Sequence, residues 1–201
     1  MRLIFLLSSL CLCVALCACG RSTPTYYYVL ESTAATAVSG DLPATSLRVA
    51  PVSVPQYLDR TGLVRHGAQP ENLTVEESHQ WAEPLAEGIR RVVQAELAAP
   101  LRGKGVHVLA NADDSDSTYT LFIHVERLEA VQPGTVRLVA QWRCDRNGRT
   151  RAQGIFAENR AVEGEGVTAQ VQAQSALVRQ RAAWIEAQLP NLGKAGEGKR
   201  S

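Results

Sequence analysis

The strongest constraint on the fold is an alternation of apolar and polar side chains between residues 119 and 144. The apolar positions recur at every second residue in two segments: Tyr119, Leu121, Ile123 and Val125, then Val136, Leu138, Ala140 and Trp142. A period of two is typical of strands with one buried face. Turn sequences at 133–134 and 145–148 separate these segments from each other and from a third segment at 150–162. Three long strands joined by tight turns predict an antiparallel meander.

Two segments have the helical period of 3.6 residues instead. The first follows Pro84, which suits the first turn of a helix because its missing N–H is not needed there. We expect this helix to end at Pro100. The second runs from Val167 to Leu189, just before Pro190. Their apolar stripes are Leu85, Ile89, Val92, Val93 and Leu97 in the first helix, and Val167, Val171, Val178, Ala182, Ile185 and Leu189 in the second.

Shorter segments complete the expected sheet, and polar or Ala/Thr/Ser/Gly-rich loops are expected at 32–46 and 111–117. The short strands are predicted at 26–30, 47–54, 62–66, 72–75 and 106–109. We therefore predict an α+β fold, in which an antiparallel sheet with a C-terminal meander is covered on one face by two helices.

The N-terminus reads as an export signal. Met1 and Arg2 precede an apolar run from Leu3 to Leu16, which is short for a membrane span. Leu16-Cys17-Ala18-Cys19 then resembles the lipobox of bacterial lipoproteins, and polar sequence follows at once. Two other interpretations are an ordinary cleaved signal and a helical anchor.

The lipobox resemblance implies a diacylglyceryl group on the Cys19 thiol, cleavage before Cys19 and acylation of the new amino group. Gly20 stands where an Asp usually retains a lipoprotein at the inner membrane, so the outer membrane is favoured. The predicted division is a signal peptide at 1–18, the lipidated cysteine and a tether at 19–24, one domain at 25–190 and a disordered tail at 191–201. The tether reaches at most roughly 20 Å, so the domain sits close to the bilayer.

The balance of charges and the positions of the cysteines limit which partners and which reactive groups we expect. Cleavage at Cys19 removes one basic residue, Arg2, from the 21 basic and 20 acidic residues, which leaves a balanced surface. Nucleic-acid binding needs a clustered basic field, so no nucleic-acid partner is expected. With Cys19 acylated, Cys144 is the one remaining thiol, and the strand alternation predicts that it is buried and inert.

The sequence contains no recognisable motif for a metal site, a catalytic site or a cofactor site. The four histidines are dispersed, and the aspartates at 113, 114 and 116 lack the glycine and closing glutamate of an EF-hand. No Gly-x-Ser-x-Gly, phosphate-loop or dinucleotide motif is present. We therefore predict no catalytic residue, metal or cofactor, and hence a protein that is not an enzyme.

Several segments together resemble one family, the PqiC/YmbA group of auxiliary lipoproteins of ABC-type lipid transporters. They are Leu47–Val52, Tyr57-Leu58-Asp59-Arg60, Leu63-Val64-Arg65 and His79-Gln80-Trp81-Ala82-Glu83-Pro84-Leu85, followed by the meander with Trp142 and the final amphipathic helix. The resemblance covers about residues 25–190. It implies a non-enzymatic subunit that works with MCE-domain proteins in lipid transport between membranes, docks the transport complex at the outer membrane, and could form a homo-oligomer.

The resemblance supplies candidates for a partner interface: Tyr57, Asp59, Arg60 and Trp81. Each has a structural alternative, since Trp81 could be a packing residue, and Asp59 and Arg60 could fix a turn through hydrogen bonds and an ion pair. Tyr26–Tyr28 cannot all face one way in a strand, so one face is open to a partner or to lipid headgroups. Two other functions are a periplasmic lipid-binding or chaperone module that carries an acyl chain between helix and sheet, and an envelope hydrolase.

Overall fold

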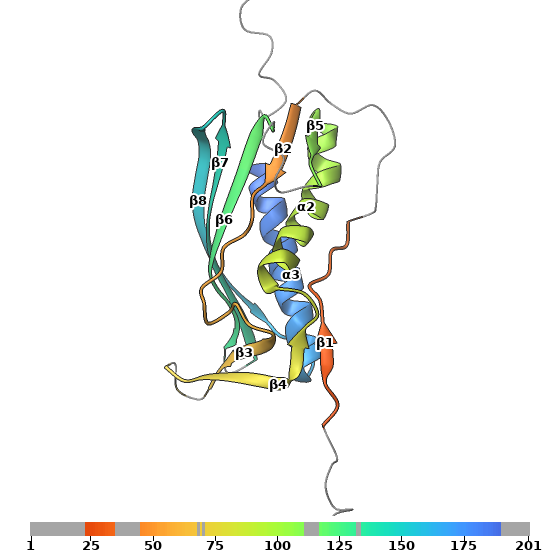
Figure 1. The fold of residues 1–201 in the computed structure, drawn as a ribbon, viewed down its shortest axis with the longest axis vertical. Helices are drawn as coiled ribbons and strands as arrows, with labels where there is room; N and C mark the ends of the chain where they lie inside the picture. Colours follow the sequence, from red (N-terminus) through yellow and green to blue (C-terminus); the bar gives the residue numbers. More distant parts are fainter. Residues whose placement is uncertain are drawn as a thin grey trace, which may run out of the picture.

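The meander predicted from the alternation is the longest part of the sheet in the computed structural model (Figure 1). Its strands β6 (Tyr119–Val131), β7 (Thr135–Arg146) and β8 (Arg149–Ala161) pair antiparallel along their lengths. Asn147 and Gly148 join β7 to β8 with φ values of 49° and 72°, the left-handed conformations that a two-residue hairpin turn requires. The meander is therefore confirmed.

The structure describes residues 23–34, 45–67, 69, 71–110, 117–131 and 134–189. The predictions for the signal peptide, for Cys19 and for the tail at 191–201 lie outside the described residues.

The remaining strands make the sheet mixed, not antiparallel throughout as predicted, because several of them pair in parallel over long sequence separations. They are β1 (Tyr26–Tyr28), β2 (Thr45–Val49), β3 (Gly62–His66), β4 (Leu73–Trp81) and β5 (Val106–Val108). The eight-stranded sheet has the order β1-β4-β3-β6-β2-β5, with β7 and β8 following from β6. The β3–β4 hairpin is antiparallel, whereas β2 lies parallel to β5 and β6. Parallel neighbours need a long crossover, and α2 supplies it between β2 and β5.

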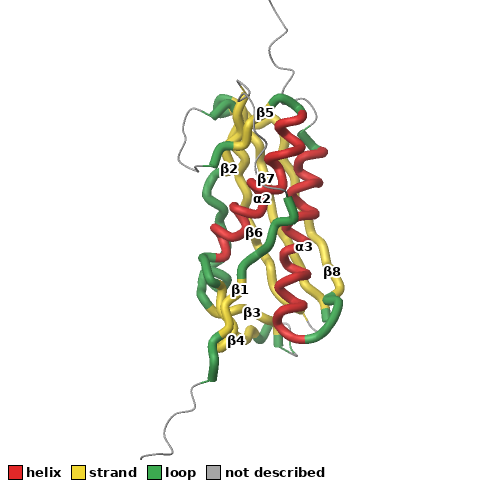
Figure 2. Tube along the Cα trace, turned by 90° about the vertical axis from the view of Figure 1, so that its right-hand side faces the viewer, coloured by secondary structure: helices red, strands yellow, loops and turns green. Residues whose placement is uncertain are grey.

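Helices α2 (Leu85–Gly103) and α3 (Gly166–Ala187) lie side by side on one face of the sheet, as Figure 2 shows. The α+β fold with two covering helices is thus confirmed. The prediction that Pro100 ends the first helix is wrong: α2 continues to Gly103. A proline in the last turn costs one main-chain hydrogen bond, and the continued helix buries Leu101 completely. Neither helix is long and apolar enough to cross a membrane, in the part of the chain that the structure describes.

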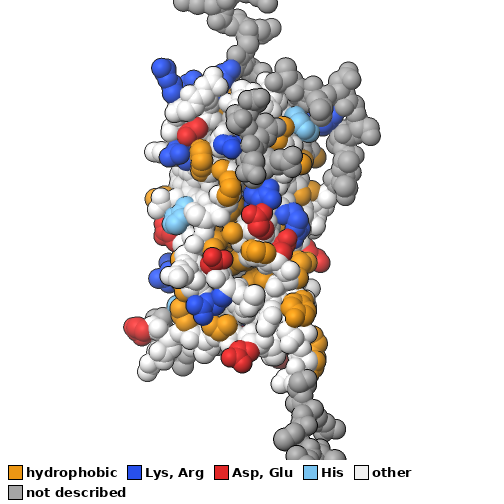
Figure 3. Space-filling model, in the orientation of Figure 1, with side chains coloured by type: hydrophobic (Ala, Val, Ile, Leu, Met, Phe, Trp, Pro, Cys, Tyr) orange, Lys and Arg blue, Asp and Glu red, His pale blue; other side chains and the backbone are white. Residues whose placement is uncertain are grey.

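The core lies between the helices and the meander. The side chains of Leu121, Val136 and Ala140 are fully buried on the sheet side, and those of Leu97 and Leu177 on the helix side. Trp142 meets Trp184 of α3 edge to face, with ring centroids 5.9 Å apart. The opposite face of the meander carries the polar members of the alternation. Figure 3 shows acidic and basic side chains intermixed on the face that it presents.

Gly154 provides a test of how closely this core is packed. It pairs with Trp142 across β7 and β8, and a Cβ at this position would lie 2.9 Å from Trp142 Nε1. We expect Gly154→Ala to lower the free energy of unfolding by about 1–3 kcal/mol, because the indole must shift within a packed core. Urea denaturation measures this. The control Gly103→Ala has no atom near its Cβ and should be neutral or stabilising by up to about 1 kcal/mol. Equal effects of the two substitutions would contradict the packing argument.

Candidate functional site

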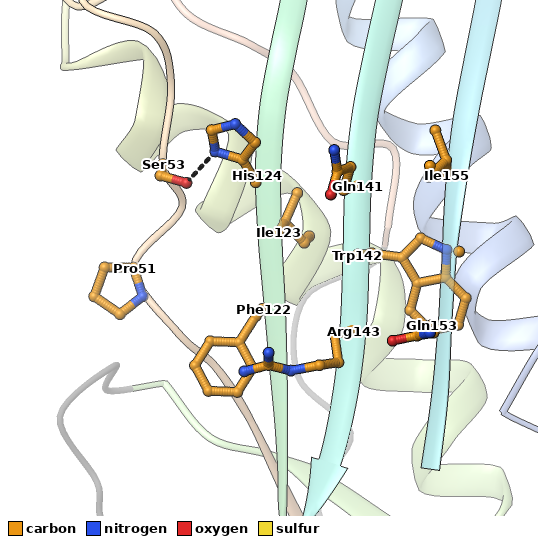
Figure 4. A pocket seen from close by; sticks show the side chains of 11 residues that line it. Pro51, Ser53, Phe122, Ile123, His124, Gln141, Trp142, Arg143, Gln153 and Ile155 are labelled. Carbon is orange, nitrogen blue, oxygen red and sulfur yellow. Dashed lines mark hydrogen bonds between the residues drawn. The ribbon is translucent and has the colours of Figure 1, made fainter. Parts of the chain in front are cut away.

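The outer face of the meander, which points away from α2 and α3, carries a groove of about 680 Å³ (Figure 4). The segment 51–53 forms one wall, strands β6 and β7 form the floor, and β8 forms the other wall. The side chain of Ile155 on β8 is 68% exposed. Strand β8 pairs with β7 alone, so its other edge is unpaired within the described sheet. An unpaired strand edge presents main-chain groups with which a strand of another chain can pair.

The wall at 51–53 is fixed to β6 by main-chain hydrogen bonds. The Ser53 amide donates to the carbonyl of Ile123 at 3.2 Å, and the Val125 amide donates to the carbonyl of Ser53 at 2.9 Å. On the floor, the guanidinium of Arg143 lies over the ring of Phe122, 4.7 Å from its centroid. The groove is therefore a built surface with both aromatic and cationic character.

Ser53 and His124 form a pair that the sequence analysis did not name. Ser53 Oγ lies 2.7 Å from His124 Nδ1, and Figure 4 shows the two side chains turned toward each other. In a Ser-His-Asp triad, a carboxylate also orients the histidine. Among the residues that the structure describes, no carboxylate bonds His124, and the nearby Glu126 carboxylate accepts from Gln141 at 2.7 Å. The Ser53–His124 contact adds a side-chain link to the main-chain bonds that fix the wall to β6.

Tyr57, one of the predicted interface residues, is held by a buried carboxylate. Its hydroxyl donates to Glu129 Oε2 at 2.8 Å, and His66 Nε2 lies 2.7 Å from Glu129 Oε1. Glu129 is 1% exposed. Burial, together with the hydrogen bond to Glu129, raises the pKa of Tyr57 above its ordinary value, so the phenol stays protonated. Tyr57 is thus partly buried and ties the segment before β3 to β6.

The other predicted interface residues fall into two environments. Trp81 is 7% exposed and packs in the core, so its indole is not available at the surface of the monomer. Asp59 and Arg60 are exposed at a turn that main-chain bonds close, including Asp59 N to Pro55 O at 3.2 Å. No ion pair joins these two side chains in the described structure. Asp59 and Arg60 are therefore the members of this set that a partner could contact most directly.

The alternative function, a lipid-binding module, would place an acyl chain in the interior between the helices and the sheet. The cavity found there, lined by Ile89, Phe156 and Val178 among others, has a volume of about 20 Å³. A space of this size holds about one water molecule and is far too small for an acyl chain. The interior is therefore filled by side chains in this conformation.

Other predicted features concern metal ligands and the lone thiol. Within the described ranges, no group of three or more His, Cys, Asp or Glu is placed to hold a metal ion. Cys144 is free and completely buried, which confirms the burial expected from the alternation. Burial and the nearby Asp145 carboxylate raise the pKa of its thiol to about 12.

The chain is similar to known proteins both in sequence, through a family model, and in structure. A family model described as "ABC-type transport auxiliary lipoprotein component" matches residues 28–186. A crystal structure of an uncharacterized protein superposes with a TM-score of 0.70 at 23% identity, covering 82% of this chain and 98% of that one. A protein from Xanthomonas campestris has a TM-score of 0.59 at 18% identity, covering 83% and 96%. These two structures share the fold. No curated protein matches the sequence significantly.

Removing the Tyr57 hydroxyl should expose the energetic role of the buried carboxylate. Tyr57→Phe leaves Glu129 with one donor fewer, so we expect the free energy of unfolding to fall by about 1–3 kcal/mol. Urea denaturation provides the measurement. Tyr27→Phe is the matched control, because Tyr27 is 65% exposed, and it should change stability by less than about 0.5 kcal/mol. A neutral Tyr57→Phe would refute the role of this hydrogen bond.

The thiol of Cys144 should make stability depend on pH in alkaline solution. Its pKa is about 12 in the folded chain against an ordinary 9.0, so the unfolded chain loses the proton first as the pH rises. The contribution of the protonated thiol to stability is complete below pH 9.0 and declines toward pH 12. Over this range, the slope of the free energy of unfolding approaches about 1.4 kcal/mol per pH unit. Urea denaturation at about pH 8 and about pH 11 gives the free energy of unfolding at each pH. Between the two pH values, this free energy should fall less for Cys144→Ala than for the wild type. Equal losses would contradict this assignment.

Proposed function

Because the chain belongs to the family of ABC-type transport auxiliary lipoprotein components, we propose that it docks an MCE-domain partner of an intermembrane lipid transport system at the outer membrane. The match over residues 28–186 is the observation that carries this proposal, since it spans the whole meander, all of α2 and α3 up to its last residue. The protein would act through binding and positioning rather than through catalysis.

The anchor is the first element of the proposed function. Acylation of Cys19 would attach up to three acyl chains, and two or more chains are needed for stable attachment to a bilayer. Gly20 at the following position favours sorting to the outer membrane. The described domain begins a few residues later, so it would work at the periplasmic surface of that membrane.

The groove on the outer face of the meander is the proposed docking surface. It is open on the face that the helices leave uncovered, and it combines the exposed Ile155 with the Phe122–Arg143 pair. The adjacent edge of β8 offers unpaired main-chain groups along a strand of 13 residues. A partner strand could pair with this edge while its side chains enter the groove. A second copy of the chain is the other occupant that such an edge accommodates.

Carriage of a lipid inside the domain has less support. An acyl chain between helices and sheet would need a cavity far larger than the 20 Å³ found there. Opening this space would separate α3 from the meander and expose Leu177 and Ile185, which are 0% and 1% exposed. Loss of that apolar burial makes the open form costly.

Photo-crosslinking in cells tests the docking surface. We expect a benzoylphenylalanine at Ile155 to form an adduct with an MCE-domain protein, because Ile155 stands at the wall of the groove. The same substitution at Ala99, which is exposed on α2 and faces away from the sheet, should give no such adduct. Mass spectrometry of the adducts identifies the partner.

Two controls define the outcome of the crosslinking. Cys19→Ser should move the protein from the membrane fraction to the soluble fraction and remove the Ile155 adduct, because the anchor is lost. An adduct between two copies of the chain would show that this face serves assembly. Equal adducts at Ile155 and Ala99 would exclude the groove as the docking surface.

A further inference from the structure

Exposed apolar side chains concentrate at one end of the molecule. Six large hydrophobic side chains are clearly exposed in the described residues, and five of them lie in β4, in β1 or one residue beyond β1. We call Tyr26, Tyr27, Leu73 and Val75 the basal patch; their exposed fractions are 40–65%. Figure 1 places β1 and β4 together at one end of the long axis, and Figure 3 shows hydrophobic side chains along β1 at the lower right.

The basal patch is held in place by specific contacts. The Tyr26 ring stacks on His79 of β4, with centroids 5.4 Å apart and planes 16° from parallel. The Tyr28 hydroxyl lies 3.0 Å from His79 Nδ1, so His79 fixes two side chains of β1. Tyr27 lies between them in the strand and points to the opposite side. These aromatic side chains are therefore presented by an ordered strand.

Chain length places this end of the molecule near the proposed anchor. Thr23, the first described residue, is four residues beyond Cys19, so the chain allows at most about 14 Å between them. Tyr26 follows three residues later. The opposite end, at the β7–β8 turn, lies roughly 40 Å away along the 13 residues of β8. The basal end is therefore the end of the long axis that lies nearer to a bilayer that holds an acylated Cys19.

The chemistry of the basal patch fits a neutral lipid surface. Tyrosine side chains are enriched at the membrane interface, where the ring meets apolar chains and the hydroxyl meets water. Strands β3 and β4 and their connection offer no net attraction to anionic lipids, because they carry one arginine against three glutamates. Arg65 is itself paired with Glu76 at 3.0 Å. Binding would therefore rest on aromatic and apolar contact and would depend little on salt.

We propose that the basal patch rests in the headgroup region of the membrane, so that the domain stands on the bilayer with its long axis directed into the periplasm. This inference rests on the acylation of Cys19 in the proposed function. It adds a second, non-covalent membrane contact that fixes the orientation of the domain. The groove would then face sideways, parallel to the membrane plane, and the β7–β8 turn would be the most distant point.

Depth-sensitive fluorescence of the full lipidated chain tests this orientation. Tyr27→Cys, Leu73→Cys and Arg149→Cys are each labelled with nitrobenzoxadiazole, and Cys144 is completely buried and escapes labelling. The proteins are reconstituted into phosphatidylcholine vesicles that contain a lipid with a nitroxide on its headgroup. We expect quenching at positions 27 and 73 to be several-fold greater than at position 149 and equal at low and high salt.

Flotation of the same vesicles separates the possible failures. A chain that floats, but whose labels at 27 and 73 are quenched no more than the label at 149, is loosely tethered, and the orientation is wrong. Self-quenching of the label at 27 that persists in detergent without nitroxide would show that a second copy covers the patch, which also overturns the proposal. A chain that does not float refutes the acyl anchor and, with it, the inference built on that anchor.

Discussion

The apolar side chains of β6 and β7 can leave water only if helices cover the face to which they point. Helices α2 and α3 supply that cover, and side chains such as Leu121 and Leu177 are completely buried between the two layers. A strand period of two places every other side chain on the opposite face. No helix covers that face in the described structure, so the groove at Ile155 is a direct consequence of one-sided burial.

The lower part of the sheet depends on a different interaction, the buried carboxylate of Glu129. A carboxylate that is 1% exposed is costly unless it is hydrogen-bonded, and Tyr57 and His66 meet this need from outside the meander. These two contacts bind the chain before β3, and β3 itself, to β6. Because β4 pairs with β3 and β1 pairs with β4, the position of the basal patch depends on this carboxylate and on the pairing of β3 with β6.

Features with a local cause could be predicted from the sequence. The meander, the two helices and the burial of Cys144 follow from period and turn chemistry, which act within a few residues. The parallel pairing of β2 with β6 joins residues more than 70 positions apart, and no local pattern encodes it. The continuation of α2 past Pro100 depends on burial of Leu101 by the rest of the fold. The Ser53–His124 contact has the same origin, since an isolated bridge brings its two segments together.

The three surfaces of the domain therefore have separate physical causes and separate positions. The helices close one face, the alternation leaves the other face open, and the exposed tyrosines lie at the end that begins the described chain. A membrane at that end would leave both the groove and the β8 edge accessible from the side. Attachment at Cys19 alone would let the domain turn, and docking of a partner would then carry a larger entropic cost. A second contact at Tyr26 and Tyr27 reduces that cost, because it restricts the orientation of the docking face before the partner arrives.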